Sequence, residues 1–389
     1  MQKVYIAEAC RTPIGKMGGV LSRIHAAELG AVVIRELIER TGIKPDAVDH
    51  VCMGCAIQAG LGQNPARQAA LKAGLPFSTT AETVNLVCAS GLEAVNIAAK
   101  MIMVGEADIV IAGGMENMSQ APFAVMKGRY GYRMGSPMFR TELIDTMIND
   151  ALWDSVNNYH MGITAENIAE KWHLTREELD NFSYASQKKA HSAISGGAFD
   201  YEIVNVSSVS SDESPRPDIT LNDLAALKPV FREGGVITAG NSSGINDGAA
   251  AVLLASTRKI KELGLKPYVE WTGYSMAGND PAYMGISPVL STRKLCALTG
   301  VSLKDADIIE LNEAFAAQVI AVVNELGIDY AKLNVHGGAI ALGHPVGASG
   351  CRILVTLIHA MRRYSLNTGI ASLCVGGGIG CSAMVRRCV

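Results

Sequence analysis

The sequence predicts a layered α/β fold built from two similar units and one long insertion. Strand-like apolar runs alternate with helical segments over residues 1–117 and again from residue 246 onward. A turn of small residues, a long apolar helix, a short strand and a glycine pair occur at 88–114 and again at 347–377. This repeat indicates a duplication with a site between the copies, although generic helix–strand patterning is the alternative.

The elements of the first unit follow from hydrophobic periodicity and from residues that begin or end helices. Asn64-Pro65 is typical of a helix start, and Gly42 and Gly74 are typical of helix ends. In chain order we expect strand 4–9, helix 26–40, strand 51–57, helix 65–73, a buried strand 81–87, a long helix from residue 90 and a strand 108–112 that ends in two glycines.

The composition of the sequence changes after residue 117. Residues 118–245 are more polar and show no clear alternation, which favours inserted loops and short helices over a separate folded domain. Within them, Thr175 and Glu178 form a capping-box pattern that predicts a helix to about residue 195, and Ser214–Pro217 must be extended.

The second unit resumes the alternation of strands and helices. We expect strand 249–255, helix 257–263, a strand near 269, helix 291–298, strand 308–311, helices 314–326 and 349–362, and paired strands 370–374 and 381–385. The predicted division is therefore a first half of 1–117 plus 246–266, a loop domain of 118–245 and a second half of 267–389.

Composition excludes several functional classes. The chain has 389 residues, is 49% hydrophobic and carries a formal net charge of −3 without any block of Lys or Arg. Nucleic-acid and membrane-surface roles therefore have little support. We find no apolar run as long as a membrane span and no signal or transit peptide. Nine cysteines without a secretory context favour a reducing cytoplasm.

One cysteine pair has spacing that could suggest a metal or redox site. Cys52 and Cys55 form a lone C-x-x-C without a second pair at zinc-ribbon spacing. We expect two thiols in a strand and its following loop, and no metal site. A redox or metal protein remains a minor alternative.

Cys88 is the residue most suggestive of catalysis. It precedes a helix, where free N–H groups and the helix dipole stabilise a thiolate and lower the pKa of a thiol. An inert buried cysteine is the alternative. His344 lies in a glycine-rich loop before a proline, which suits an imidazole that accepts the Cys88 proton.

Two further motifs lie at strand ends in the second unit. Cys374 precedes a glycine run that is neither a P-loop nor a dinucleotide fingerprint, but that suits backbone donors facing an oxyanion. Asn312 lies at a strand-to-helix junction, where a helix cap is a strong alternative to a functional role.

Taken together, the motifs Val87–Gly91, Asn312–Ala316, Gly343–Gly347 and Cys374–Gly378 resemble, in order and spacing, the signatures of the thiolase family. Asn158–Glu166 resembles the short-chain branch of that family. The resemblance covers essentially the whole chain. It implies a duplicated, layered α/β/α/β/α fold with an inserted loop domain that binds coenzyme A (CoA).

The resemblance also implies a reaction and its catalytic residues. The reaction is the reversible Claisen condensation of two acetyl-CoA molecules to acetoacetyl-CoA and CoA, through an acetyl-Cys88 intermediate. His344 would activate Cys88, and Cys374 would remove or return the α-proton. Asn312 would hold a water that forms one oxyanion hole with His344, and the N–H groups of Cys88 and Gly376 would form the second.

The remaining implications of the resemblance concern binding and assembly. The substrates are CoA thioesters and no cofactor is needed. The family resemblance implies a homotetramer arranged as a dimer of dimers. Residues that match CoA-binding or pocket positions are Ser243, His160, Met161, Arg216, Phe315 and Ala314.

Other functions remain open at this stage. They are a broad-chain degradative 3-ketoacyl-CoA thiolase, a β-ketoacyl synthase-type condensing enzyme and a non-catalytic acyl-CoA-binding relative. A condensing enzyme would need a second-half histidine where Cys374 stands. A weaker hypothesis is that oxidation joins Cys88 to Cys374 and stops activity.

Overall fold

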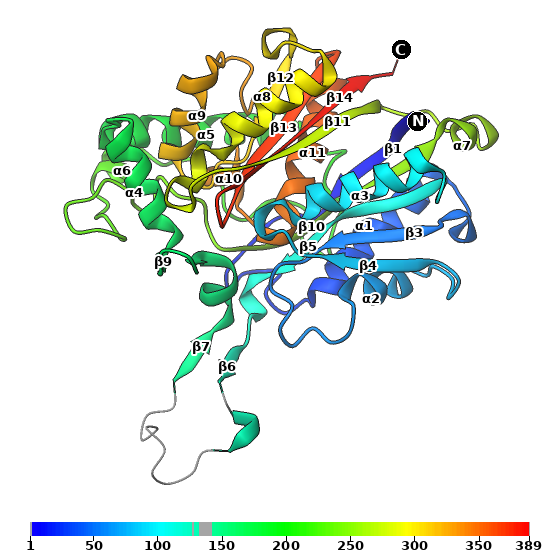
Figure 1. Cartoon of the computed structure of the whole chain (residues 1–389), viewed down its shortest axis with the longest axis horizontal. Helices are drawn as coiled ribbons and strands as arrows, with labels where there is room; N and C mark the ends of the chain where they lie inside the picture. Colours follow the sequence, from blue (N-terminus) through cyan, green and yellow to red (C-terminus); the bar gives the residue numbers. More distant parts are fainter. Residues whose placement is uncertain (1, 127, 132–141, 389) are drawn as a thin grey trace.

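The computed structural model describes residues 2–126, 128–131 and 142–388. Within these residues a ten-stranded mixed sheet runs through the molecule, with strand order β12-β13-β14-β11-β1-β10-β5-β3-β4 and β2 paired to β10 (Figure 1). Its strands are β1 (Val4–Arg11), β2 (Gly15–Lys16), β3 (His50–Gly54), β4 (Thr80–Val84), β5 (Ile109–Asn117), β10 (Asn246–Ser256), β11 (Val269–Gly278), β12 (Ile308–Leu311), β13 (Thr368–Val375) and β14 (Ile379–Arg387).

Helices cover both faces of the sheet, and two of them lie at its centre. Their bounds are α1 (Ala26–Thr41), α2 (Pro65–Lys72), α3 (Ser90–Val104), α4 (Met161–Lys171), α5 (Arg176–Ser195), α6 (Leu221–Ala225), α7 (Thr257–Glu262), α8 (Ser287–Thr299), α9 (Ala316–Leu326), α10 (Ala339–Leu342) and α11 (Val346–Arg363). The central helices α3 and α11 contact each other. Helix α3 packs on β3, β5 and β10, and α11 packs on β5 and β10 and also on β12 and β13.

Three apolar clusters separate the layers. The first lies around α3 and α11, the second between the β11–β14 region and α4, α8 and α9, and the third between α1 and α2 and the first-half strands. The two groups of strands join where Tyr5 and Ile6 of β1 pair with Glu270 and Val269 of β11. The predicted α/β/α/β/α layering is therefore confirmed, and α3 and α11 form its middle layer.

Local sequence accounts for most element boundaries. In α1 the periodic residues Leu29, Val33 and Leu37 are buried, and Gly42 ends the helix with φ 66°. The Asn64 side chain accepts a hydrogen bond from the N–H of Arg67 at the start of α2, as predicted. The capping box of Thr175 and Glu178 is likewise present at the start of α5.

Three strand predictions need correction. The strand expected at 51–57 is β3, which ends at Gly54. The buried strand expected at 81–87 is β4, which ends at Val84 and is half-exposed because it lies at the sheet edge. The strand expected to end at Gly113-Gly114 continues to Asn117. The two glycines do not end it. They permit close packing instead, since a Cβ at Gly113 would lie 2.0 Å from the Ala250 carbonyl oxygen and one at Gly114 2.1 Å from that of Gly347.

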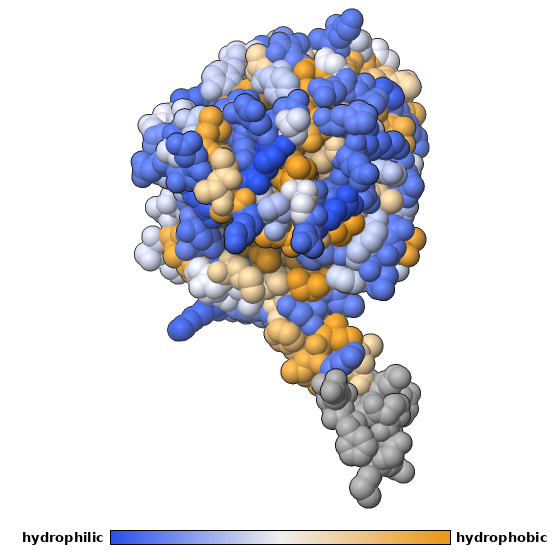
Figure 2. All heavy atoms as spheres, turned by 90° about the vertical axis from the view of Figure 1, so that its left-hand side faces the viewer, coloured by the Kyte–Doolittle hydropathy of each residue, from blue (hydrophilic) through white to orange (hydrophobic). Residues whose placement is uncertain are grey.

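The predicted insertion contains α4 to α6 and two short hairpins, β6 (Phe123–Val125) with β7 (Leu143–Asp145) and β8 (Trp153–Asp154) with β9 (Tyr159–His160). The β6–β7 pair extends away from the body (Figure 1). Apolar side chains gather on this arm (Figure 2), and those exposed there are Phe123, Val125, Met126 and Leu143. Residues 127 and 132–141 of the predicted loop domain lie outside the described residues.

One segment corrects the expectation that no apolar run is as long as a membrane span. Among the described residues, Val87–Val104 is long and apolar enough by composition, and 56% of this window is buried inside the protein. Because this segment is essentially α3, its packing against α11 and against β3, β5 and β10 accounts for its apolar character.

Candidate active site

A cavity of about 520 Å³ lies where the two halves and the insertion meet. It brings together residues that are far apart in the sequence. The predicted residues that line it are Cys88, His160, Met161, Arg216, Ser243, Ala314, Phe315, His344 and Gly376. Asn312 and Cys374 do not line it and are 0% and 1% exposed. Asn312 contacts His344, and the charge of Cys88 acts on Cys374.

Cys88 lies in a single tight turn, Val87–Ala89, between β4 and α3. Val87 has φ 45°, which is unusual for a β-branched residue and indicates local strain. Side chains hold the turn: Asn85 Oδ1 accepts from the Val87 N–H at 3.0 Å, and Ser90 Oγ accepts from the Leu86 N–H at 2.8 Å. The thiol is thereby fixed at the cavity wall, directly before α3.

The protonation state of Cys88 differs from the sequence-based expectation. Burial raises the pKa of this thiol to about 11, and the N–H groups of Gly376 and of Cys88 itself lower it only in part. The expectation of a lowered pKa was wrong because desolvation outweighs the donors at the helix start. At neutral pH Cys88 is therefore a thiol, and its attack on a substrate requires a proton acceptor.

His344 has the properties of that acceptor. Its loop is anchored by Asn246, whose Oδ1 accepts from the His344 N–H at 2.9 Å, while Gly343 before it has φ 111°. The imidazole Nδ1 lies 2.5 Å from Ser349 Oγ, and Ser349 donates its own proton to the Pro345 carbonyl at 2.8 Å. Nδ1 must therefore carry the hydrogen, which leaves Nε2 as an acceptor.

The electrostatics keep this imidazole neutral. Burial, followed by the positive charge of Arg352, lowers the pKa of His344 to about 3. The resting pair of Cys88 and His344 is thus a thiol and a neutral imidazole.

Cys374 lies at the end of β13 and is almost fully buried. Burial raises the pKa of its thiol, and the negative charge of a Cys88 thiolate raises it further. That electrostatic interaction indicates that the two thiols are neighbours. Both are free in the structure, so a disulfide between them stays a prediction.

The glycines after Cys374 form the turn into β14. Gly377 and Gly378 have φ values of 86° and 81°, which glycine adopts without strain. A Cβ at Gly376 would lie 3.7 Å from Met161 Sδ and 3.8 Å from Val87 Cγ1. The Gly376 backbone thus reaches the Cys88 turn, where its N–H donates toward the thiol.

Asn312 follows β12 and contacts His344. Its backbone N–H donates to the Ser372 carbonyl at 2.9 Å, and its Nδ2 lies 3.5 Å from His344 Nε2. Its Oδ1 faces Arg352 Nη2 at 3.4 Å. The alternative interpretation of Asn312 as a helix cap is wrong, because α9 begins after Phe315 without a side-chain cap.

The residues predicted to bind CoA or to line the pocket form a further part of the cavity wall. The His160 ring stacks on Phe231 with centroids 4.7 Å apart, and Phe231 meets Phe315 edge-on at 6.2 Å. Ser243 is held by its N–H, which donates to the Ala314 carbonyl at 3.0 Å. Arg216 adds a cation, as does Lys16, which sequence reasoning missed.

Several buried polar residues that support the site also escaped sequence reasoning. Glu116 accepts from the N–H groups of Ala56, Ile57 and Gly347 at 2.9, 3.2 and 2.8 Å, and so fixes the start of α11. Asn246 anchors the His344 loop from β10. A carboxylate in an otherwise apolar strand was a usable signal for Glu116. Asn246, which adjoins a polar loop, gave none.

Two alternative sites are less favourable. Among the described ranges, no group of three or more His, Cys, Asp or Glu residues is arranged to hold a metal ion. The Cys52 thiol instead contacts Glu82, and the Cys55 thiol contacts Glu116, each at 3.5 Å. Each thiol of the C-x-x-C pair thus contacts a carboxylate side chain.

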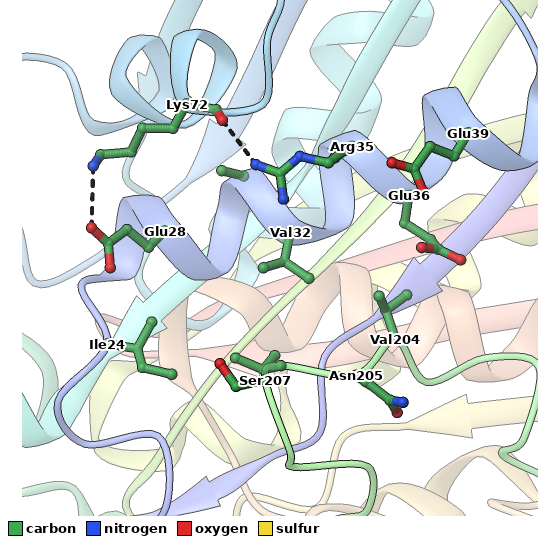
Figure 3. A pocket seen from close by; sticks show the side chains of 12 residues that line it. Ile24, Glu28, Val32, Arg35, Glu36, Glu39, Lys72, Val204, Asn205 and Ser207 are labelled. Carbon is green, nitrogen blue, oxygen red and sulfur yellow. Dashed lines mark hydrogen bonds and ion pairs between the residues drawn. The ribbon is translucent and has the colours of Figure 1, made fainter.

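A second cavity of about 600 Å³ lies between α1 and residues 204–207 (Figure 3). Charged side chains in it pair with one another, as Lys72 does with Glu28 at 3.1 Å, and Arg35 donates to the Lys72 carbonyl. None of its lining residues belongs to the predicted site.

Comparisons with known proteins agree with this geometry. The family models "Thiolase, N-terminal domain" and "Thiolase, C-terminal domain" match residues 4–258 and 265–387. An acetyl-CoA acetyltransferase of Pseudomonas aeruginosa is 53% identical over 396 residues, which cover 100% of both chains. One of Chromobacterium violaceum is 52% identical over 394 residues, which cover 99% of this chain and 100% of the relative.

Solved structures match over the same length. The crystal structure of the Bacillus anthracis acetyl-CoA acetyltransferase superposes with a TM-score of 0.95 at 44% identity, covering 100% of this chain and 99% of the other. Human mitochondrial 3-ketoacyl-CoA thiolase in complex with CoA gives 0.96 at 38% identity, with 100% and 98% covered. The chain belongs to the thiolase family.

Proposed function

We propose that this thiolase-family acyltransferase catalyses the reversible condensation of two acetyl-CoA molecules to acetoacetyl-CoA and CoA. The observation that carries the proposal is the convergence of Cys88, His344 and Gly376 on one cavity, with Asn312 and Cys374 buried nearby. Full-length relatives named acetyl-CoA acetyltransferase support the short substrate. CoA thioesters are then substrates, and the chemistry calls for no cofactor.

In the first half-reaction Cys88 becomes acetylated. His344 Nε2 takes the thiol proton while Cys88 Sγ forms a bond to the thioester carbon of acetyl-CoA. The oxyanion lies at the N–H groups of Cys88 and Gly376. When the bond to the CoA sulfur breaks, Cys374 donates its proton to that sulfur. The raised pKa of Cys374 suits this role, because the thiol is protonated at rest.

In the second half-reaction the acetyl group moves to carbon. The Cys374 thiolate removes an α-proton from a second acetyl-CoA, and the enolate oxygen is stabilised by protonated His344 and a water held by Asn312. The enolate carbon attacks the acetyl carbon. The Cys88–acetyl bond breaks and Cys88 recovers its proton from His344. Each group returns to its starting protonation state.

The outer half of the cavity is proposed to bind CoA. Residues 118–245 contribute His160, Met161, Arg216 and Ser243 to its wall, which supports a role of the insertion as the CoA-binding loop domain. The cations Arg216 and Lys16 suit the phosphates of CoA. The first half, residues 1–117 plus 246–266, would then supply the nucleophile. The second half, residues 267–389, would supply the acid–base groups.

The decisive experiment is thiolysis of acetoacetyl-CoA by CoA, measured beside 3-ketooctanoyl-CoA. We expect cleavage of the short substrate, with loss of activity after treatment with iodoacetamide. Equal use of the longer substrate would instead assign the activity of a broad-chain degradative 3-ketoacyl-CoA thiolase. Failure to cleave either substrate refutes the proposal.

We further propose a cytoplasmic homotetramer, arranged as a dimer of dimers. The β6–β7 arm supports assembly, since Phe123 and Leu143 are each 62% exposed on a hairpin that leaves the body. Light scattering should give a tetramer for the wild-type chain and a smaller species for F123D/L143D. An L298D control alters an exposed leucine on α8 and should leave the tetramer intact.

A further inference from the structure

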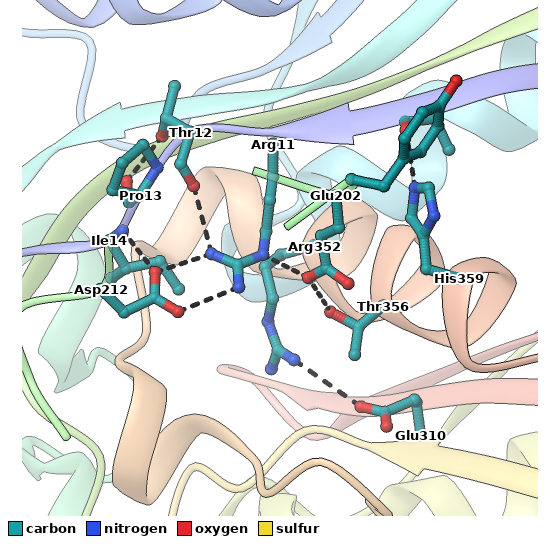
Figure 4. A network of polar contacts seen from close by, with 12 residues as sticks. Arg11, Thr12, Pro13, Ile14, Glu202, Asp212, Glu310, Arg352, Thr356 and His359 are labelled. Atoms are coloured by element: carbon teal, nitrogen blue, oxygen red, sulfur yellow. Dashed lines mark hydrogen bonds and ion pairs between the residues drawn. The ribbon is translucent and has the colours of Figure 1, made fainter. Parts of the chain in front are cut away.

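Arg352 is a buried cation next to the active site, but it does not line the cavity. It lies on α11 and is 1% exposed. Its Nη1 lies 3.6 Å from Glu310 Oε2, and its Nη2 lies 3.4 Å from Asn312 Oδ1 (the Glu310 pair is drawn in Figure 4). Within the described residues, its Nε and Nη1 have no hydrogen-bond partner. The contact with Asn312 is therefore its main hydrogen bond.

The chemistry of arginine gives this contact a direction. A guanidinium has only donors, so the atom of Asn312 that faces it must be the carbonyl oxygen Oδ1. The other end of the amide, Nδ2, then faces His344 Nε2. Without Arg352, either end of the amide could face the imidazole.

These contacts form a chain in which every hydrogen bond is donated in the same direction. Arg352 donates to Asn312, and Asn312 Nδ2 faces the unprotonated Nε2 of His344. His344 Nδ1–H donates to Ser349, which donates to the Pro345 carbonyl. The chain begins at a group that can only donate and ends at one that can only accept.

We propose that Arg352 is a positioning residue for the reaction, which orients the Asn312 amide so that Nδ2 faces His344 and the water of the oxyanion hole. This inference rests on the proposed function, because it assigns Arg352 to the same oxyanion hole. An inverted amide would present Oδ1 to the imidazole and would repel a developing enolate.

The positive charge of Arg352 has a second effect. It lowers the pKa of His344, although burial of the imidazole lowers that pKa more. Loss of this charge would therefore make the imidazole easier to protonate in the resting enzyme. The loss in the step that forms the enolate is therefore expected from the amide orientation, and neither effect removes a contact with CoA.

The test compares R352M with R352K in the thiolysis of acetoacetyl-CoA. Methionine keeps most of the side-chain volume but cannot donate, and we expect kcat to fall about 10²-fold, as for the loss of one oxyanion-hole donor. The KM for both substrates should stay within about twofold, since Arg352 touches no cavity wall. Lysine can donate to Oδ1 and should restore kcat at least about tenfold relative to R352M.

A matched control separates positioning from folding. Arg11 is a second fully buried arginine of the same region, paired with Glu202 and with Asp212 at 2.7 Å (Figure 4), and it contacts neither Asn312 nor His344. R11M should lower the melting temperature but keep kcat per folded site within about threefold. If R352M does not fold, the R352M/E310L variant removes the unpaired carboxylate as well and should show the same loss of kcat.

Two results would overturn the assignment. One is an R352M or R352M/E310L enzyme with wild-type kcat per folded site. The other is an equal loss of kcat in R352M, R352K and R11M, which a merely structural role predicts. A wild-type chain that does not cleave acetoacetyl-CoA would instead refute the proposed function, before any variant is compared.

Discussion

At the scale of single residues, the proposed mechanism divides the chemistry between two cysteines with different surroundings. Cys88 faces the cavity and accepts hydrogen bonds from backbone N–H groups. Cys374 is buried, and the charge of Cys88 raises its pKa. Burial raises the pKa of both thiols, so neither is a thiolate at rest. Each must therefore exchange its proton with a neighbour during the reaction, and the two can be separated by mutation.

The C88A variant should lose both acyl transfer and thiolysis. Alanine has no group that can hold the acetyl chain, and no other thiol lines the cavity among the residues described. Mass spectrometry of enzyme incubated with acetyl-CoA should find the acetyl group on the Cys88 peptide of the wild type and on no peptide of the variant. Full thiolysis by C88A would contradict the assignment of the nucleophile.

The C374A variant should separate the two half-reactions. Acetylation of Cys88 should persist, because His344 and the backbone donors remain in place and the CoA thiolate can leave without the proton that Cys374 would give it. Condensation should fall by about 10²–10⁴, the usual contribution of a positioned acid–base group. Acetyl-enzyme formation and acetoacetyl-CoA formation are measured on the same preparation. Unchanged condensation would exclude Cys374 as the base.

At the scale of elements, the position of α11 depends on backbone contacts with β5. Gly114 of β5 faces the carbonyl of Gly347 in the first turn of α11, and Glu116 of the same strand accepts from the Gly347 N–H. His344 and Ser349 lie on either side of this turn. The glycine in β5 thus sets how closely α11, the helix that directly follows the loop of His344, approaches the sheet.

We expect G114A to damage both stability and catalysis. Its Cβ would meet the Gly347 carbonyl oxygen at 2.1 Å, so α11 must shift. Overpacking of this kind costs roughly 1–3 kcal/mol, and a displacement of about 1 Å can cost about 10² in kcat. Urea unfolding and thiolysis measure the two effects.

The control is G278A at the end of β11, where an added Cβ meets no atom within 4 Å. Its free energy of unfolding and its kcat for thiolysis should equal those of the wild type. Equal behaviour of G114A and G278A would show that the contact between β5 and α11 tolerates the methyl group.

At the scale of elements, features set by neighbouring residues could be predicted from the sequence, and features set by distant contacts could not. Helix periodicity and caps predicted α1, α2 and α5, because those signals lie within a few residues of each other. The raised pKa of Cys88 was not predictable, since it depends on burial by distant segments. The contact of Arg352 with Asn312 joins residues 40 positions apart, and no local pattern indicates it.

At the scale of the whole molecule, packing two layered halves around α3 and α11 buries titratable groups in the interior. His344 and His359, both on or next to α11, are each 7% exposed. Burial lowers the pKa of both imidazoles, so the folded state favours their neutral form. The dense centre that positions the site therefore links stability to pH.

His359 allows this linkage to be measured apart from catalysis. Its Nε2 donates to the Ala9 carbonyl at 2.8 Å, and it lies near Glu202, Glu8 and Arg362. Because its folded pKa is below the ordinary value of 6.5, its contribution to stability is complete above that pH and is lost as pH falls. The loss is at most about 1.4 kcal/mol per pH unit for one proton.

The free energy of unfolding in urea should therefore fall less between pH 7 and pH 5 in H359Q than in the wild type. Glutamine can still donate to the Ala9 carbonyl but takes up no proton. H191Q, at an exposed position of α5, controls for the loss of a histidine as such. A pH dependence of H359Q equal to that of the wild type would mean that the protein relaxes around a charged His359. The centre of the molecule would then be more open to water than its packing indicates.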